Sequence, residues 1–305
     1  MTLHGPETET TNRTPSSPPR LNALRRFGRS YATLPAGIAG LAVLLAFAAL
    51  ALLAPTFIGP EQLDVTKATG QRLAAPTSDY LLGTDESGRS ILMLVIWGAR
   101  TSLTIGIIAT VITMVLGSTI GLLAGHYQGW VGNVLMRITD WFIALPSLPM
   151  AISLAAVLGQ GSASIIIAIA ITSWTRTTRL VRAQTLAVGA RPFIERAKVL
   201  GAGNVQVMLR HVLPNVVPLI LVSSTLTVAS AILDAATLTF LGLGDPTNVS
   251  WGSMLNAAFA QGAVTAGAWW YVLTPGVAIL VVVLGFTLTG RAVEHVLNPR
   301  MAGER

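Results

Sequence analysis

The sequence predicts an all-α polytopic membrane protein with six transmembrane helices, and three observations support this fold class. Of 305 residues, 52% are hydrophobic and only 11% are charged, whereas soluble domains carry charge at about 25% of their positions. The mean hydropathy is +0.65. Several apolar stretches exceed the roughly 18 residues needed to cross the hydrocarbon core of a bilayer. Cysteine is absent, which excludes a disulfide framework and a cysteine-ligated metal site.

The chain begins with a polar segment and a first membrane helix. Residues 1–35 are rich in proline and poor in apolar side chains, which predicts a disordered tail. This tail ends in a basic cluster of Arg20, Arg25, Arg26 and Arg29. The apolar stretch over about 35–54 follows a polar lead too long for a signal peptide and exceeds the roughly 7 to 15 apolar residues of one. We therefore expect an uncleaved transmembrane helix.

Five more apolar spans follow an exposed connector that is broken by glycine and proline over about 55–96. The spans are expected near 101–124, 138–159, 162–181, 214–240 and 271–290. One transmembrane domain then covers residues 36–300, with core spans over about 101–290 and a short tail at 301–305. An even number of spans puts both termini on one side of the membrane.

The distribution of basic residues predicts which side that is. Four of the twenty Lys and Arg residues fall outside if the termini are inside, namely Lys67, Arg72, Arg89 and Arg100. Because positive charge accumulates in cytoplasmic segments, this bias predicts cytoplasmic termini. The net charge of +7 is therefore explained without a nucleic-acid partner.

Small residues predict close helix packing in the second span. Gly117, Gly121 and Gly125 recur at spacings of four, which puts them on one helical face. Glycines so arranged let another membrane helix approach closely. We expect these three residues to serve bundle packing.

Two prolines and one carboxylate are candidates for a pathway or gate. Pro146 and Pro149 lack amide hydrogens, so they should kink or interrupt the third span; such a kink serves either a moving gate or a static bend. Asp234 lies in the fifth span, where it could line a pathway, bind a cation or proton, or pair locally. Asp140, three residues after Arg137, is expected to pair with that arginine at the membrane surface.

The sequence contains no catalytic constellation. It lacks a glycine-rich phosphate-binding loop followed by Lys and Ser or Thr, so the chain alone is not expected to bind ATP. It also lacks a His-Glu-x-x-His zinc motif, and its four histidines are widely dispersed. These features predict a protein that is not an enzyme by itself and binds no metal or cofactor.

The longest predicted inside loop, over about 182–213, has the pattern of two short helices joined by a turn. Pro192 and Glu195 suit the first turn of a helix, and Gly201 suits the left-handed position that ends it. Asn204 is expected to cap a second helix that runs to Leu213. An apolar stripe is predicted on the first helix, formed by Phe193, Ala197 and Leu200. The loop is either a membrane-surface anchor or a docking element for a cytoplasmic partner.

Here the sequence resembles the permeases of ATP-binding-cassette importers. Their hallmark is Glu-Ala-Ala, three residues, Gly, nine residues, then a hydrophobic residue and Leu-Pro. Glu195-Arg196-Ala197, Gly201, His211 and Leu213-Pro214 match this layout, with Arg196 replacing the usual alanine. Further motifs resemble the C-type subunit of the dipeptide and oligopeptide permeases. They are Leu82-Gly83-Thr84-Asp85, Gly88-Arg89-Ser90, Gly98-Ala99-Arg100-Thr101-Ser102-Leu103, Phe240-Leu241-Gly242-Leu243-Gly244, Ser250-Trp251-Gly252-Ser253-Met254 and Leu297-Asn298-Pro299-Arg300.

This resemblance implies a type I importer permease fold in the bacterial inner membrane. Expected partners are a second, homologous permease, two cytoplasmic ATPases, an extracytoplasmic solute-binding protein and membrane lipid. ATP and Mg would bind on the ATPases rather than on this chain. The helix with Phe193, Glu195, Ala197, Leu200 and Gly201 would couple to the ATPases, and the passage would lie between the two permeases.

Two other functional classes compete with this interpretation. A self-powered secondary transporter needs coupling-ion residues and, commonly, internal repeats, but the spans offer only Asp140 and Asp234 and no obvious repeat. An assembly or anchoring protein would explain the inside loop but not the outer motifs. Among importer substrates, peptides are the expected choice, with nickel and other small solutes left open.

Overall fold

A computed structural model describes residues 27–297, which are mostly helical. This part of the chain forms no β-strand, only a bridge between Thr84 and Ser90, so the all-α prediction is confirmed for it. The predicted tails at 1–35 and 301–305 lie outside the described residues, except for positions 27–35. The helices are α2 (Pro35–Phe57), α3 (Pro60–Leu63), η1 (Val65–Lys67), α4 (Ile91–His126), α5 (Trp130–Ala144), α6 (Ser147–Leu158), α7 (Ser162–Gly189), α8 (Pro192–Val199), α9 (Asn204–Val207), η2 (Met208–Val212), α10 (Leu213–Phe240), α11 (Trp251–Ala260) and α12 (Trp269–Leu297).

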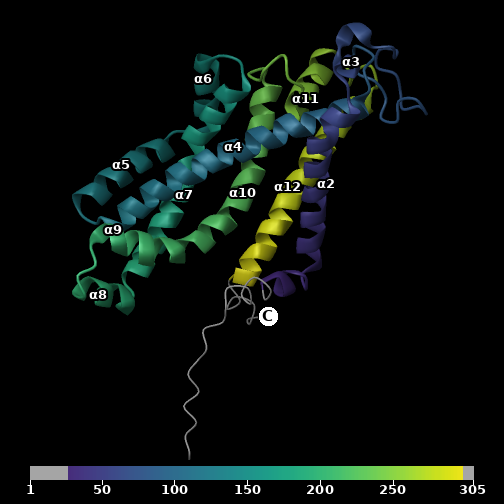
Figure 1. The fold of residues 1–305 in the computed structure, drawn as a ribbon. Helices are drawn as coiled ribbons and strands as arrows, with labels where there is room; N and C mark the ends of the chain where they lie inside the picture. Colours follow the sequence, from purple (N-terminus) through teal and green to yellow (C-terminus); the bar gives the residue numbers. More distant parts are fainter. Residues whose placement is uncertain (1–26, 298–305) are drawn as a thin grey trace, which may run out of the picture.

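The long helices lie side by side and their connections collect at two ends (Figure 1). The end that we call the α8 end holds α8 and α9, the start of α2 and the finish of α12. The opposite end, the α11 end, holds α3, α11 and the connector between α2 and α4. Because α2 starts and α12 finishes at the same end, the described chain traverses the bundle an even number of times.

The predicted six spans are found only in part. Four helices, α2, α4, the continuous α9–η2–α10 helix and α12, are long and apolar enough to cross a membrane, and α5 with α6 makes a fifth candidate bent by 90°. The fourth predicted span, at about 162–181, is a helix, α7, but it is not among these candidates. Its second half carries Arg176, Arg179 and Arg182, and these charges lower its mean hydropathy.

The second span begins earlier than predicted. Helix α4 starts at Ile91 rather than near residue 101 and runs for 36 residues, or about 54 Å at 1.5 Å per residue. Neither Gly98 nor Arg100 breaks it, because both are accommodated by neighbouring groups. Gly98 packs against Trp251 of α11, and the Arg100 guanidinium lies 5.9 Å from the centre of the Trp97 ring. The helices from α4 to α12 therefore extend from 91 to 297, beyond the 101–290 predicted for the core spans.

Helices α4 and α7 form the most extensive pair in the bundle, and the predicted glycine face lies between them. A Cβ atom on Gly117 would be 2.6 Å from Cβ of Thr177, and one on Gly121 would be 2.6 Å from the Thr178 carbonyl oxygen. Gly125 similarly faces Thr185. The three glycines thus line the closest approach of two helices, where any side chain would force them apart.

Candidate coupling loop and transport pathway

Helix α8 ends as its sequence predicted. Gly201 has a φ of 86°, in the left-handed region that a side chain disfavours. The Gly201 amide donates to the Lys198 carbonyl at 3.0 Å, and the Ala202 amide donates to the Ala197 carbonyl at 3.0 Å. This pair of hydrogen bonds is the Schellman motif, and it turns the chain sharply toward α9.

One side chain that sequence reasoning missed anchors α8 to the bundle. Ile194 is only 1% exposed and packs in a cluster with Leu122, Val181, Val207 and other residues of α4, α7, η2 and α10. The predicted stripe faces elsewhere: Ala197 is half-buried, and Phe193 and Leu200 are exposed. The apolar spacing identified an amphipathic helix but could not tell which of its apolar residues meet the protein.

The side of α8 away from the bundle presents bare apolar surface. Val199 and Leu200 are each 87% exposed, and Phe193 is 38% exposed. Beside them, α9 and η2 border a surface hollow lined by Gly203, Asn204, Val205, Gln206, Leu209 and Arg210. Large apolar side chains at such exposure, grouped beside a hollow, are typical of a protein contact surface.

The second half of the loop differs from the prediction. Asn204 is the first residue of α9 rather than its cap, and the capping position is taken by Gly203, whose φ is −68°. The helix also continues past Pro214, because a single π-helical turn, η2, joins α9 to α10. Pro214 is the second residue of α10, directly after the π-helical turn, so its missing amide hydrogen falls where the helical hydrogen-bond pattern changes.

The third predicted span is interrupted as expected, but by one proline rather than two. The 90° bend separates α5 from α6, and Pro146 holds the capping position of α6. Pro149 is the third residue of α6, where the amide of any residue would have no helical partner. Pro149 therefore fits the helix start without bending it.

The two carboxylates of the spans have different surroundings. Asp140 forms an ion pair at 2.7 Å with Arg179 of α7, so the predicted pairing with Arg137 is wrong. Asp234 lies in a small pocket with Ser147 and Leu148 of α6, Thr172 of α7 and three apolar side chains. The structure thus brings Asp234 close to the bend at Pro146, which unites two of the pathway candidates.

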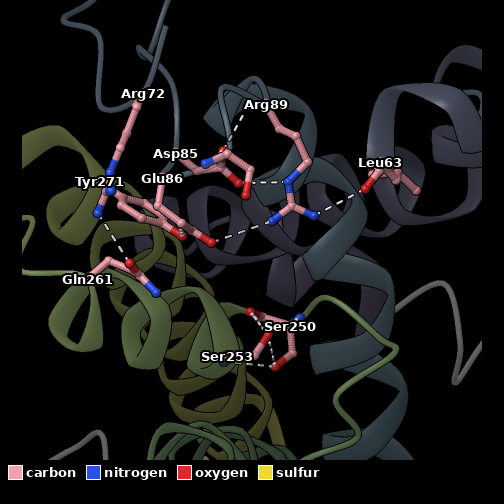
Figure 2. Close-up of polar contacts among 10 residues, drawn as sticks. Leu63, Arg72, Asp85, Glu86, Arg89, Ser250, Ser253, Gln261 and Tyr271 are labelled. Carbon is pink, nitrogen blue, oxygen red and sulfur yellow. Dashed lines mark hydrogen bonds and ion pairs between the residues drawn. The ribbon is translucent and has the colours of Figure 1, made fainter. Parts of the chain in front are cut away.

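At the α11 end, the structure shows a cluster of polar contacts that the sequence did not predict (Figure 2). The fully buried Asp85 carboxylate accepts hydrogen bonds from the Ser87 amide at 2.9 Å and the Arg89 amide at 2.8 Å, and from Arg89 Nε at 2.7 Å. Arg89 Nη1 donates to the Leu63 carbonyl at 3.1 Å. We call Leu63, Asp85, Glu86, Arg89 and Tyr271 the Asp85 clasp.

Glu86 extends the clasp to the last helix. The Tyr271 hydroxyl of α12 donates to Glu86 Oε2 at 2.6 Å, and nearby Arg72 donates to Gln261 Oε1 at 3.2 Å (Figure 2). These bonds join the connector between α2 and α4 to the region around α11 and α12. The motif over residues 82–90 is therefore a structural clasp.

The Ser-Trp-Gly-Ser motif has a similar structural task. Trp251 is fully buried; its indole donates to the Val95 carbonyl at 3.0 Å, and its amide donates to Ser102 Oγ at 3.1 Å. Ser250 and Ser253 form a reciprocal capping box at the start of α11. Together these contacts fix α11 against α4.

Two loops at the α11 end are closed by aspartates that cap their own turns. Asp64 accepts from the hydroxyl of Thr66 at 2.7 Å and from its amide at 2.8 Å. Asp245 does the same with Thr247. In both, the hydroxyl bond and then the amide bond lower the pKa of the carboxyl below its usual range, because each favours the charged form.

The described residues present three features that bear on function. Within residues 27–297, no group of three or more His, Cys, Asp or Glu side chains could hold a metal ion. What the arrangement provides is an exposed apolar helix at one end, a polar clasp at the other and a bent helix pair beside a carboxylate between them.

Comparison with known proteins identifies close relatives of this architecture. The family model described as binding-protein-dependent transport system inner membrane component matches residues 117–303. The chain is 39% identical over 296 residues to the di/tripeptide transport system permease protein DppC of Pseudomonas aeruginosa, covering 94% of this chain and 96% of that protein. It is 37% identical over 267 residues to the dipeptide transport system permease protein DppC of Alkalihalophilus pseudofirmus, covering 87% and 86%.

A further relative and a solved structure agree with these matches. The glutathione transport system permease protein GsiD of Pectobacterium atrosepticum is 35% identical over 278 residues, covering 91% of this chain and 90% of that protein. The inward-facing MetNI methionine ABC transporter has a similar fold, with a TM-score of 0.56 at 18% identity, covering 68% of this chain and 97% of the matched chain.

Proposed function

Because the chain belongs to the family of binding-protein-dependent transport system inner membrane components, it is a permease subunit of an ATP-binding-cassette importer, and we propose that it carries dipeptides or longer peptides. The observation that carries this substrate class is the 39% identity over 94% of the chain to a di/tripeptide permease. Relatives named for dipeptides and glutathione support it, since glutathione is itself a small peptide.

The proposed topology has six crossings with the α8 end in the cytoplasm. In it, α7 crosses as the fourth span although it carries three arginines, because its charged half lies toward the α8 end and its apolar half toward α6 (Figure 1). Arginines near a cytoplasmic surface extend into the interface at little cost. The positive-inside bias favours the same orientation.

The proposed coupling element is α8 with the turn at Gly201. Ile194 holds the helix to the bundle, while Phe193, Val199 and Leu200 are left exposed. Glu195 is also exposed, and Ala197 is half-buried, between the side of α8 that packs on the bundle and the side that is exposed. In this proposal the exposed side chains bind a groove on a cytoplasmic ATPase, as an amphipathic helix binds a hydrophobic groove. Closure of the ATPases would then push α8 and shift the bundle between its two open states.

The proposed complex contains a second permease, two ATPases and a solute-binding protein. ATP and Mg would bind on the ATPases, because this chain has no phosphate-binding loop. The segment closed by the Asp85 clasp and α11 would face the solute-binding protein. Pro146, Pro149 and Asp234 would line or bend the pathway, and Gly117, Gly121 and Gly125 would keep α4 against α7.

Transport by the purified complex tests the proposed function. The permease pair, ATPases and binding protein are reconstituted in vesicles, and uptake of a radiolabelled dipeptide is measured with and without ATP. We expect ATP-dependent uptake that requires the binding protein. Uptake by the permeases alone, driven by a proton or sodium gradient, would instead support a secondary transporter, and nickel uptake without peptide uptake would reject the substrate class.

Thiol labelling tests the topology, because the chain has no cysteine of its own. Lys67→Cys at the α11 end and Lys198→Cys on α8 are treated with a membrane-impermeant reagent in intact cells. Labelling is expected at Lys67→Cys only, and at both sites after the membrane is opened. Labelling of Lys198→Cys in intact cells would contradict a cytoplasmic α8 end.

A further inference from the structure

Helix α10 carries a row of polar side chains through an otherwise apolar span. Their spacings of four, three, four and three keep them within a narrow arc of the helix. Their hydroxyls bond to carbonyls of the same helix, as Thr227 does to Ser223 at 2.9 Å and Thr237 to Leu233 at 2.8 Å. We call this row the α10 polar face; it consists of Ser223, Thr227, Ser230, Asp234 and Thr237.

Asp234 is the one member of the α10 polar face that its own helix does not satisfy. It makes no hydrogen bond or ion pair with another residue of the described chain. Its carboxylate is half-buried in the pocket it shares with α6 and α7, and the first turn of α6 there stabilises a negative charge through its helix dipole. Since a charge within a span is costly in lipid, an ionised Asp234 is stable here only if this face meets water or a charged ligand.

A cation of opposite sign lies on the neighbouring helix. Arg176 is four residues along α7 from Thr172, which lines the Asp234 pocket, so it lies about one helical turn from that pocket on the same side of α7. Its guanidinium is exposed and has no ion-pair partner within residues 27–297. The next arginine on this side, Arg179, is already paired with Asp140. An unpaired acid and an unpaired base therefore lie on two packed helices, with the base about one helical turn from the pocket that holds the acid.

We propose that the α10 polar face lines the translocation pathway, and that Asp234 receives the ammonium end of a zwitterionic peptide while Arg176 receives its carboxylate end. This inference rests on the proposed function, because it takes the substrate to be a peptide. A carboxylate is the natural partner of an ammonium group, and a guanidinium binds a carboxylate through two parallel hydrogen bonds. Peptides of different side chains share these two charged ends, so such a pair suits a broad substrate range.

Single cysteines on α10 test whether its polar face meets water and favours cations. Ser230→Cys lies on the face, one turn from Asp234. Thr225→Cys is the matched control, because Thr225 packs against Gly290 of α12. Both are made in the assembled complex, and labelling of this chain is followed with a cationic and an anionic methanethiosulfonate reagent.

The account predicts that Ser230→Cys is labelled and Thr225→Cys is not. Relative to a free thiol, Ser230→Cys should prefer the cationic reagent by about fivefold, the size expected of one carboxylate acting across several ångströms of partly hydrated protein. Adding Asp234→Asn should remove this preference, whereas Asp234→Glu should retain it. Excess dipeptide should slow the labelling.

Peptide uptake provides the second measurement and separates this inference from the proposed function. In vesicles where the unmodified complex imports peptide, Asp234→Asn and Arg176→Gln should each raise the KM for dipeptide while leaving assembly intact. The site would be overturned by unchanged uptake in these two variants or by equal reaction of Ser230→Cys with both reagents. It would also be overturned if removing either charge prevented assembly of the complex. If Ser230→Cys prefers the cationic reagent but the unmodified complex imports no peptide, the peptide assignment is rejected, and the proposed ligand with it.

Discussion

The two ends of the bundle differ in how their polar and apolar side chains are buried and paired. At the α11 end, Asp85 is fully buried, and each of its oxygens accepts from Arg89 or a backbone amide. At the α8 end, Val199 and Leu200 are 87% exposed, and Ile194 is the only residue of α8 that is buried. The α11 end pairs its buried carboxylate within the chain, whereas α8 leaves neighbouring apolar side chains uncovered by the rest of the described chain.

This difference indicates that the α8 end, unlike the α11 end, gains stability mainly when a partner covers it. Buried hydrogen-bonded charges stabilise one geometry and are costly to disturb, so the Asp85 clasp should fix the shape of the α11 end in the isolated chain. Exposed apolar side chains contribute little to the isolated chain and become favourable when covered. Substitutions should therefore cost stability at the α11 end and association at the α8 end.

The largest loss of stability is expected for Asp85→Asn. It removes the fully buried charge that Arg89 Nε pairs with at 2.7 Å and leaves half-buried Arg89 only the longer contact to Glu86 at 3.9 Å, which should cost about 3 to 5 kcal/mol. Glu61→Gln is the control, because the Glu61–Lys67 pair is exposed and should contribute about 0 to 1 kcal/mol. Thermal unfolding of the purified complex measures both, and equal midpoints for the two variants would contradict the role of the clasp.

Two glycines with similar backbone angles provide the next comparison. Gly88 has a φ of 83°, and a Cβ there would run into the Gly70 carbonyl oxygen; Gly201 has a φ of 86° and no atom near its added Cβ. Gly88→Ala should therefore destabilise by about 1 to 3 kcal/mol beyond the shared backbone strain. Gly201→Ala should show only that strain, about 1 kcal/mol. The difference in unfolding midpoint is the measurement, and an equal loss would contradict it.

Gly201→Val should separate stability from coupling. The open space around Gly201 leaves room for the side chain, so membrane insertion should be intact and stability should fall by about 1 kcal/mol. The altered turn would re-aim α8, so ATPase co-purification should weaken and uptake should be lost. Gly203→Ala is the control, because its φ of −68° suits any residue. Normal uptake by Gly201→Val at matched expression would reject the coupling role.

The smallest effect on stability is expected for Leu200→Ser. At 87% exposure the change should stay within about 0.5 kcal/mol, yet it should lower the fraction of ATPase that co-purifies. Leu81→Ser, on an exposed leucine at the α11 end, should change neither quantity. If both variants retain ATPase equally, the exposed apolar surface of α8 is not the contact.

Local chemistry accounts for the parts of this structure that the sequence predicted. The left-handed Gly201 and the break at Pro146 depend on backbone preferences of single residues. The apolar stretches likewise identified every long helix. Where helix starts depend on tertiary contacts, prediction failed, as at Ile91, whose helix passes Gly98 because Trp251 packs against it.

Contacts between distant residues account for what the sequence could not predict. Asp140 pairs with Arg179, 39 positions away, instead of Arg137, and Glu86 bonds to Tyr271 across 185 positions. Ile194 and Leu200 are both apolar residues of one short loop, and only the position of α7 and η2 decides which is buried. Motif resemblance marked residues 82–90 as important but did not reveal that their role is to clasp two helices.

Site-specific cross-linking compares the two ends most directly. A benzophenone maleimide is attached to Leu200→Cys on α8 or to Lys67→Cys at the α11 end of the assembled complex, which is then illuminated. The account predicts that Leu200→Cys captures an ATPase subunit, that nucleotide changes the yield, and that Lys67→Cys captures none. Absence of ATPase capture from Leu200→Cys in a complex that retains its ATPases, or capture from Lys67→Cys, would contradict α8 as the coupling element.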